Sequence, residues 1–482
     1  MAQTQTLSEK ETATRTPQPG LTITGTGDSQ QDAAQPNAPP PPPPNGGYGW
    51  VCCACVAVVN AHTWGLNSSY GVFLAYYLAN DLYPGATSLQ YAFVGSLSIS
   101  CALLTSPLAT IGVRTMGTKP TMMLGVVLEA ASLICASFAN EIWHLFLTQG
   151  VMFGVGMGFL FVASVPIVPQ WFSTRRSLAN GVSTSGSGLG GLIYSFATGA
   201  MLQSLGLAWT FRVLGIVAFV VNTICTILVK DRNKILNATQ LAFDVKLFKR
   251  PEYLLLLGYG FFSMLAYVVM IFSLANYANY IGLGASQAAL VSAMYNMGQG
   301  LGRPLVGYFS DRTGRITMAS FMTLVAGILS LAIWIPAKHY ATLIVFAILG
   351  GGVGGTFWVT IGPVTAEVLG LRHVASGLNI QWLFIALPCV FSEPIALQIV
   401  EGSGSYLGTQ LFTGFMFMTA AACTFVCRGW KIGEQQELER RYGGGDEIDA
   451  DKIAYEEEAS GHGKKAGRKR MLVDCLSFKR KV

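Results

Sequence analysis

Arg176-Ser-Leu-Ala-Asn-Gly181 and Arg372-His-Val-Ala-Ser-Gly377 share one pattern, Arg-x-x-Ala-x-Gly, and the second copy begins 196 residues after the first. A second pattern recurs at almost the same distance. It is a Pro-Leu pair with a glycine ten residues after the proline, found at 107–117 and again at 304–314, an offset of 197 residues. Two patterns displaced by nearly the same distance predict that the chain consists of two similar halves.

The composition indicates that these halves lie in a membrane. About half of the residues are apolar (51%) and 12% are charged, whereas a soluble domain carries roughly 25% charged residues. Twelve apolar stretches are long enough to cross a hydrocarbon core of about 30 Å, and the sequence lacks the polar shell that twelve buried helices would need in water. The stretches lie roughly at 50–78, 90–112, 121–139, 142–165, 177–200, 209–229, 253–279, 286–309, 316–336, 341–365, 374–397 and 408–427.

We therefore expect an all-α integral membrane protein with twelve transmembrane helices in two six-helix, pseudo-symmetric halves. Such repeats are typical of secondary transporters, whose substrate site lies between the halves. The expected parts are a disordered cytoplasmic tail at 1–47, a first half at 48–229, a cytoplasmic linker at 230–252, a second half at 253–428 and a cytoplasmic tail at 429–482.

The placement of Lys and Arg predicts the orientation, because cytoplasmic loops carry an excess of these residues. One set of loops holds nearly all of them, so both termini are expected in the cytoplasm, and the plasma membrane is the expected location. The net charge of +6 follows from this topology and gives no argument for nucleic-acid binding. The charged loops carry Arg114, Lys119, Arg175, Arg176, Lys230 through Arg250, Arg312, Arg315, Arg372 and the residues from Arg428 onward.

Three local patterns each allow two interpretations. Cys52-x-x-Cys55 has a metal or redox spacing, but small apolar filler on a helix in lipid is the favoured interpretation. The proline run at 39–44 suits a spacer or a ligand for an SH3 or WW domain. The basic cluster at 464–470 suits a solvated tail or a contact with anionic lipid. No metal, cofactor or enzymatic nucleophile–base pair is expected.

Gly307-Tyr-Phe-Ser-Asp-Arg-Thr-Gly-Arg315 closes the eighth stretch and resembles the loop signature Gly-x-x-x-Asp-Arg-x-Gly-Arg of the major facilitator superfamily. Asp311 is expected to accept hydrogen bonds at a helix N-terminus and to pair with Arg, which would latch one conformation. A loop that only obeys the positive-inside rule explains the arginines but not the fixed Pro, Gly and Asp spacing. The candidate gate residues are Asp311, Arg312, Arg315, Arg176, Glu367 and Arg372.

The eighth stretch also carries a polar stripe. Ser292, Asn296, Gln299 and Arg303 follow the spacing i, i+4, i+7, i+11, so they share one helix face. An Arg inside a membrane span is costly and usually faces a partner or a watery cavity, and its forked guanidinium suits a carboxylate. The alternatives are an Arg that snorkels to the interface or pairs with an acid such as Glu367. The stripe predicts a substrate site.

Other polar residues in the spans are weaker candidates. Asn379 and Trp382 on the eleventh stretch are expected to line the cavity, although Trp382 equally suits packing. His62 titrates near neutral pH and is a candidate for proton coupling, with a packing role as the alternative. Glu129 and Glu393 are acids within apolar stretches and carry the same two interpretations.

The start of the first stretch, Asn45-Gly-Gly-Tyr-Gly-Trp50, resembles the Asp-Gly-Gly-Trp-Gly-Trp opening of the monocarboxylate porter family, within the major facilitator superfamily. A second family signature, an aromatic–basic–Leu-Ala-x-Gly segment, is matched by Trp171 through Gly181. The resemblance covers roughly 45–428, and the long polar N-terminal tail is similar to that of fungal members. It implies proton-linked movement of small carboxylates.

The resemblance also implies an Asp and an Arg four residues apart in the eighth span and a Lys in the first span. Arg303 matches the Arg, whereas Gln299 occupies the Asp position and Ser68 stands about where the Lys is expected. The pair that carries the proton in the family is therefore absent, and Ser68 becomes a candidate for substrate contact.

Three functions are compatible with the sequence. The first is a secondary active transporter that moves a small organic solute, a carboxylate or related organic anion, by alternating access, with membrane lipid, the solute and potentially protons as its partners. The second is an efflux permease for a secondary metabolite. The third is a solute sensor that has a transporter fold but does not transport.

Overall fold

The computed structural model describes residues 43–80, 82–83, 85–233, 243–370 and 373–442, and within these ranges the secondary structure is helical without strands. Six spans form the first half: α1 (Tyr48–Asn60) continued by η1 (Ala61–Gly65), α2 (Leu66–Ser68) and α3 (Tyr70–Asn80); α4 (Ser88–Leu104) with α5 (Ser106–Thr115); α6 (Thr118–Ala136); α7 (Ile142–Leu145), η2 (Phe146–Met152), α8 (Phe153–Ser164) and α9 (Ile167–Trp171); α10 (Arg176–Ser204); and α11 (Gly206–Leu228).

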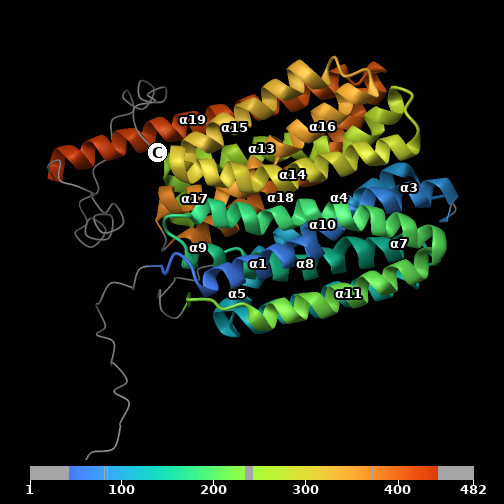
Figure 1. Ribbon diagram of the computed structural model, residues 1–482, viewed down its shortest axis with the longest axis horizontal. Helices are drawn as coiled ribbons and strands as arrows, with labels where there is room; N and C mark the ends of the chain where they lie inside the picture. The colour runs from blue at the N-terminus through green and yellow to red at the C-terminus, as the bar shows by residue number, and fades with distance from the viewer. Residues whose placement is uncertain (1–42, 81, 84, 234–242, 371–372, 443–482) are drawn as a thin grey trace, which may run out of the picture. The chain divides into compact units, whose positions relative to one another are not determined.

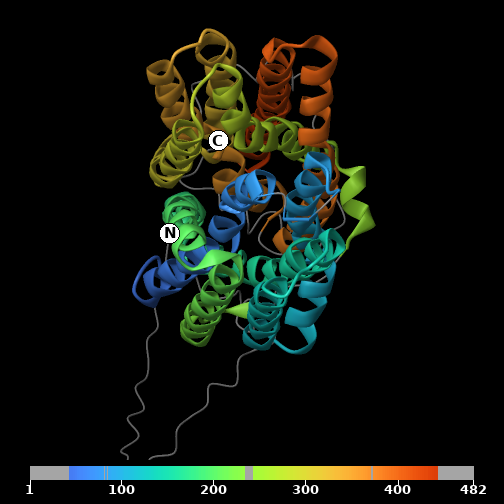
Figure 2. The same ribbon diagram turned by 90° about the vertical axis from the view of Figure 1, so that its right-hand side faces the viewer.

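A short 3-10 turn, η3 (Val245–Lys249), precedes the second half. Its six spans are α13 (Pro251–Tyr280); α14 (Ala285–Thr313); α15 (Arg315–Leu329) with η4 (Ser330–Trp334); α16 (Tyr340–Gly354) with α17 (Thr356–Leu369); α18 (Val374–Ser403); and α19 (Leu407–Tyr442). The helices of the second half form one group in Figure 1, coloured yellow-green to red, and those of the first half form the other, coloured blue to green. The end-on view of Figure 2 shows the same two groups.

The predicted all-α fold with two six-helix halves is confirmed. The sequence places the end of the last apolar stretch near residue 427. The helix that carries this stretch, α19, continues without interruption to Tyr442. The polar end of the helix is supported by pairs three residues apart, Lys431 with Glu434 at 2.7 Å and Glu437 with Arg440 at 4.0 Å.

Two spans differ from the rest in composition. Ten of the twelve spans in the described part of the chain are both long and apolar enough to cross a membrane by themselves. The other two are α10 and α14, rich in Gly, Ser and polar residues, and they pack against each other at the border between the halves (Figure 1). A Cβ on Gly181 would lie 2.5 Å from the carbonyl oxygen of Arg303, so glycine permits this close approach.

The duplication seen in the sequence has a structural counterpart. Gly117 separates α5 from α6, and Gly314 separates α14 from α15, each by a tight turn. Their φ values are 93° and 105°, a region where side chains other than glycine are strained. The second span packs on the fourth through α4 and α8, and the eighth packs on the tenth through α14 and α16. Equivalent spans therefore make equivalent contacts in the two halves.

Candidate substrate site and latch

Arg303 projects from α14 into the border between the halves and is only 4% exposed. Its Nη1 donates to the carbonyl oxygen of Thr184 at 2.6 Å and to the hydroxyl of Ser187, both on α10 of the first half. Its Nη2 donates to the hydroxyl of Tyr267 at 3.1 Å and to Oε1 of Gln299. All four acceptors are neutral, so the guanidinium charge is buried without an acid among the described residues.

The Nε atom of Arg303 is buried and has no hydrogen-bond partner among the described residues. The alternative partner considered from the sequence, Glu367, contacts Arg315 instead, 3.3 Å from its Nη1. Gly355 makes room for the guanidinium, because a Cβ there would lie 2.8 Å from Nε of Arg303. Arg303 therefore keeps one donor free and one positive charge unpaired at the border between the halves.

Arg303 lies on a cavity of about 60 Å³ between the halves. A volume of this order holds a few water molecules and lies well below the pockets that hold drug-sized ligands. The cavity in the described conformation is therefore too small for such a ligand. The lining residues are Asn60, Trp64, Asn67, Ser68, Ile99, Phe161, Thr184 and Ser187 from the first half, and Met264, Tyr267, Val268, Ile271, Phe272, Asn296, Gln299, Arg303, Trp358 and Cys389 from the second.

The structure brings together some of the predicted substrate residues and separates others. Asn296, Gln299 and Ser68 line the Arg303 cavity, as the sequence predicts for the site. Asn379 and Trp382 do not, since they line a second cavity of about 20 Å³. Asn379 donates to the hydroxyl of Thr110 at 2.6 Å, which is a contact between the halves.

Several lining residues are missed by the sequence analysis. Thr184 and Ser187 belong to a Gly- and Ser-rich segment of α10, and such small residues are typical of close helix packing in membranes. Tyr267, Trp64 and Trp358 stand in apolar stretches where an aromatic side chain is ordinary. These residues are recognised only because the structure brings them together from four different spans. A tyrosine in the middle of a span is the one signal in the sequence, because its buried hydroxyl needs a hydrogen-bond partner.

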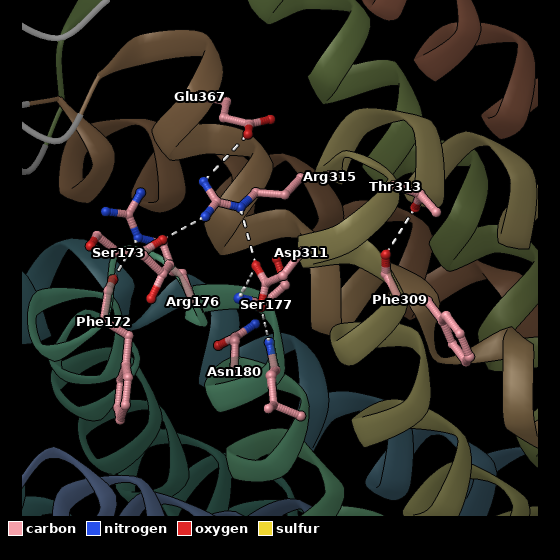
Figure 3. Close-up of polar contacts among 12 residues, drawn as sticks. Phe172, Ser173, Arg176, Ser177, Asn180, Phe309, Asp311, Thr313, Arg315 and Glu367 are labelled. Carbon is pink, nitrogen blue, oxygen red and sulfur yellow. Dashed lines mark hydrogen bonds and ion pairs between the residues drawn. The ribbon is translucent and has the colours of Figure 1, made fainter. Parts of the chain in front are cut away.

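Asp311 lies at the end of α14 and contacts the first half directly (Figure 3). Its Oδ1 accepts from the backbone N–H of Ser177 at 3.0 Å, and its Oδ2 accepts from that of Leu178 at 2.9 Å. These are among the first N–H groups of α10, which have no partner within their own helix. A carboxylate there is further stabilised by the helix dipole. We call this contact, together with Arg315, the latch.

Arg315 joins the latch to two further elements (Figure 3). Its Nε lies 3.6 Å from Oδ1 of Asp311, its Nη1 lies 3.3 Å from Oε1 of Glu367 on α17, and its Nη2 donates to the carbonyl oxygen of Ser173 at 2.9 Å. A further hydrogen bond between the halves forms nearby, where the amide of Asn180 donates to the carbonyl oxygen of Val359 at 2.5 Å. The end of the bundle that carries Asp311 is therefore closed.

The other predicted gate residues are placed differently. The guanidinium of Arg312 lies over the ring of Tyr308, 4.3 Å from its centre, and takes no part in the latch. Arg176 is buried, and its Nε donates to the carbonyl oxygen of Phe172 within its own half at 3.1 Å. Arg372 lies outside the described residues.

Asn45 forms a further contact beside the latch. Its Oδ1 accepts from the backbone N–H groups of Ser173 and Thr174 at 2.7 and 3.1 Å and lies 3.1 and 3.2 Å from their hydroxyls, and its Nδ2 donates to the hydroxyl of Ser173 at 2.9 Å. Its φ is 56°, which asparagine tolerates better than most residues. Asn45 falls within the predicted tail at 1–47, yet it binds the loop that contains Ser173, whose carbonyl oxygen accepts from Arg315. Both sequence signatures that resemble the monocarboxylate porters thus meet at one place.

The three candidates for proton coupling lie outside the Arg303 cavity. The Nδ1 of His62 lies 2.9 Å from the carbonyl oxygen of Val58, and its ring meets that of Tyr194 at 5.5 Å. Glu129 is fully buried, accepts from the amide of Asn222 at 2.9 Å, and has a second oxygen without a partner among the described residues.

Glu393 is the third candidate and belongs to the second half. Its two oxygens accept from the hydroxyl of Ser273, each at 3.0 Å. No cation pairs with Glu393 or Glu129 among the described residues, so the hydrogen-bond donors that each acid meets are neutral.

Comparison with known proteins agrees with this geometry. The model of the Major Facilitator Superfamily matches residues 54–275 and 255–442. The chain is 33% identical to the probable transporter MCH2 of Saccharomyces cerevisiae, over 81% of this chain and 84% of that protein. It is 24% identical to the agnestins efflux protein AgnL12 of Paecilomyces divaricatus, over 76% of this chain and 83% of that protein.

Among solved structures, the fucose:proton symporter FucP of Escherichia coli is similar, with a TM-score of 0.59 and 15% identity over 79% of this chain and 99% of that one. At this identity the likeness shows the fold alone. Together with the two six-helix groups and the polar site between them, the matches place this multi-pass membrane protein among transporters: the chain belongs to the Major Facilitator Superfamily.

Proposed function

We propose that this transporter moves an organic anion with a carboxylate group, as a member of the monocarboxylate porter family. The observation that carries the proposal is the state of Arg303, which is buried, charged, unpaired by any described acid and left with a free Nε donor beside a cavity. A buried charge of this kind is costly unless a partner compensates it. A carboxylate supplies both the opposite charge and the hydrogen-bond acceptors that the guanidinium needs.

Alternating access gives the latch its role. We take the end that carries Asp311 to face the cytoplasm, since the basic loops gather there, and the membrane to be the plasma membrane. With the latch formed, the cytoplasmic route to the cavity is closed. Opening this route separates Asp311 from α10 and breaks the contact between Arg315 and Ser173. Each half then moves as a unit about the site.

A coupling proton, if one moves with the solute, requires a carrier other than Gln299. The three candidates are His62, Glu129 and Glu393. Of these, Glu129 is favoured, because its fully buried carboxyl has one oxygen without a partner among the described residues. The solved structure of similar fold, FucP, is named a fucose:proton symporter, which is compatible with the use of protons by this transporter.

Export of a secondary metabolite is the second candidate function. It is favoured by the name of one relative, the agnestins efflux protein AgnL12. Uptake and export use the same site and differ in the direction of the driving gradient. Transport measured in both directions across one liposome membrane therefore separates them.

The test of the proposed function uses purified protein and pairs of probes that differ in charge. Acetate and benzoate are compared with the neutral acetamide and benzamide, and binding is measured as a rise in the midpoint of thermal unfolding. We expect at least one carboxylate, but neither amide, to stabilise the protein and then to be taken up into proteoliposomes. Arg303→Gln should lose the response, Arg303→Lys should keep part of it, and Arg312→Gln should resemble the wild type. An equal response to acids and amides, or an unchanged response in Arg303→Gln, contradicts the proposal.

A further inference from the structure

The residues around Arg303 restrict the solute further than a carboxylate group alone does. Among the eighteen residues that line the cavity, Arg303 is the only one with a fixed charge, and no Asp, Glu, Lys or His is present. A solute with one negative charge leaves the site neutral. A second carboxylate, or the ammonium group of an amino acid, would enter a buried site without an opposite charge, which is costly.

The cavity also has two N–H donors without acceptors. They are Nε of Arg303 and Nε1 of Trp64, both buried and both lacking a partner among the described residues. Among the described lining residues, these two donors are the buried side-chain atoms that lack a partner. The oxygens of an anionic solute can accept from such donors.

Three aromatic rings form one wall of the cavity, which we call the aromatic wall: Trp64, Phe161 and Trp358. The ring centre of Trp64 lies 5.2 Å from that of Phe161 and 5.1 Å from that of Trp358, and Phe161 and Trp358 are 6.1 Å apart. The three come from three spans, two of the first half and one of the second. They are edge-on or tilted to one another, which are arrangements that aromatic rings favour.

The aromatic wall is backed on its far side. Trp382 is stacked on Trp358 at 5.8 Å with an angle of 17°, and it lines the second cavity rather than the first. Tyr267, which accepts from Arg303, meets Trp358 at 6.2 Å. Tyr267 and Trp358 thus connect the guanidinium to the wall, so that a single flat molecule of modest length reaches both.

We propose that the cavity selects aromatic monoanions, with the carboxylate at Arg303 and the ring against the aromatic wall. The selection disfavours small aliphatic monocarboxylates, dicarboxylates and zwitterionic amino acids. This inference rests on the proposed function, because it assumes that Arg303 receives the anionic group. It adds a solute class: a flat, unsaturated body that stacks on Trp64, Phe161 and Trp358.

The test compares anions that share a carboxylate and differ in the body. The probes are benzoate and phenylacetate, the saturated ring cyclohexanecarboxylate, the small acetate and butyrate, the dianion succinate and the zwitterion phenylalanine. Affinities come from the dependence of the thermal unfolding midpoint on probe concentration, using the full-length protein. We expect the two aromatic monoanions to bind at least tenfold more tightly than every other probe.

Variants of the aromatic wall assign the preference to its residues. Trp358→Leu should reduce the affinity for benzoate about tenfold and leave that for acetate within twofold. Trp64→Phe, which keeps a ring but removes the free N–H, should retain the preference better than Trp64→Leu. Trp143→Leu is the matched control, since Trp143 is 55% exposed and is not among the lining residues.

The outcomes separate this inference from the proposed function. If cyclohexanecarboxylate and acetate bind as tightly as benzoate, or if Trp358→Leu binds benzoate normally, the aromatic preference is wrong while organic anion binding stands. If no carboxylate binds, both fail. If succinate or phenylalanine binds best, the charge argument fails even when Arg303→Gln abolishes binding.

Discussion

Removing the carboxylate of Asp311 should weaken the contact between the halves at the latch. The loss of free energy can be estimated from the hydrogen bonds that Asp311 accepts. Asp311→Ala deletes two charge-assisted hydrogen bonds, to the N–H groups of Ser177 at 3.0 Å and Leu178 at 2.9 Å. At about 1.5 kcal/mol for each bond, the low end for charged acceptors, the closed contact loses about 3 kcal/mol. Because about 1.4 kcal/mol corresponds to a factor of ten, the opening equilibrium shifts about 150-fold.

Hydrogen exchange of the same backbone amides measures this shift directly, because exchange of a protected N–H reports the free energy of the local opening. Peptides that cover the start of α10 should exchange about 150-fold faster in Asp311→Ala, and by a smaller factor in Asp311→Asn. Arg312→Ala is the control, since Arg312 lies over Tyr308 and outside the latch. The reasoning is refuted if exchange at the start of α10 stays within threefold of the wild type, or if the control shows the same acceleration.

Three further predictions follow from single contacts. Gly355→Ala places a Cβ 2.8 Å from Nε of Arg303, so the rate of transport should fall about tenfold. The control is Gly433→Ala, which has open space around it and should not change the rate. Equal rates in the two variants would exclude the clash. Asn45→Ala removes the oxygen that accepts from the backbone N–H groups of Ser173 and Thr174 and should cost about 2 kcal/mol, seen as a lower thermal unfolding midpoint. Asn45→Asp keeps an acceptor oxygen, so it should be less destabilised than Asn45→Ala. Equal unfolding midpoints for the two variants would show that these hydrogen bonds contribute nothing to stability. Glu129→Gln should abolish uptake driven by a pH gradient while preserving solute exchange, and gradient-driven uptake at the normal rate would exclude Glu129 as the proton carrier.

The sequence predicts the fold well because membrane spans are recognised by length and apolar content, which are local properties. The same reasoning finds Arg303, since an arginine inside an apolar span stands out without any neighbour. Thr184 and Tyr267 are missed, because their importance lies in facing Arg303 from other helices. Asn379 is assigned to the cavity by its helix position, but α18 turns it toward Thr110. Pairings between spans depend on tertiary packing, which spacing along the chain does not encode.

The polar character of α10 and α14 has a consequence for how the protein is made. Each is too polar to partition readily into lipid by itself, and each is covered by the other in the finished bundle. During synthesis, α10 emerges from the ribosome long before α14. The first half must therefore enter the bilayer with one poorly lipid-soluble helix still lacking its partner, and it depends on neighbouring spans or on the insertion machinery until α14 arrives. Two helices that line the candidate site are thus also the ones that make the two halves dependent on each other during biogenesis.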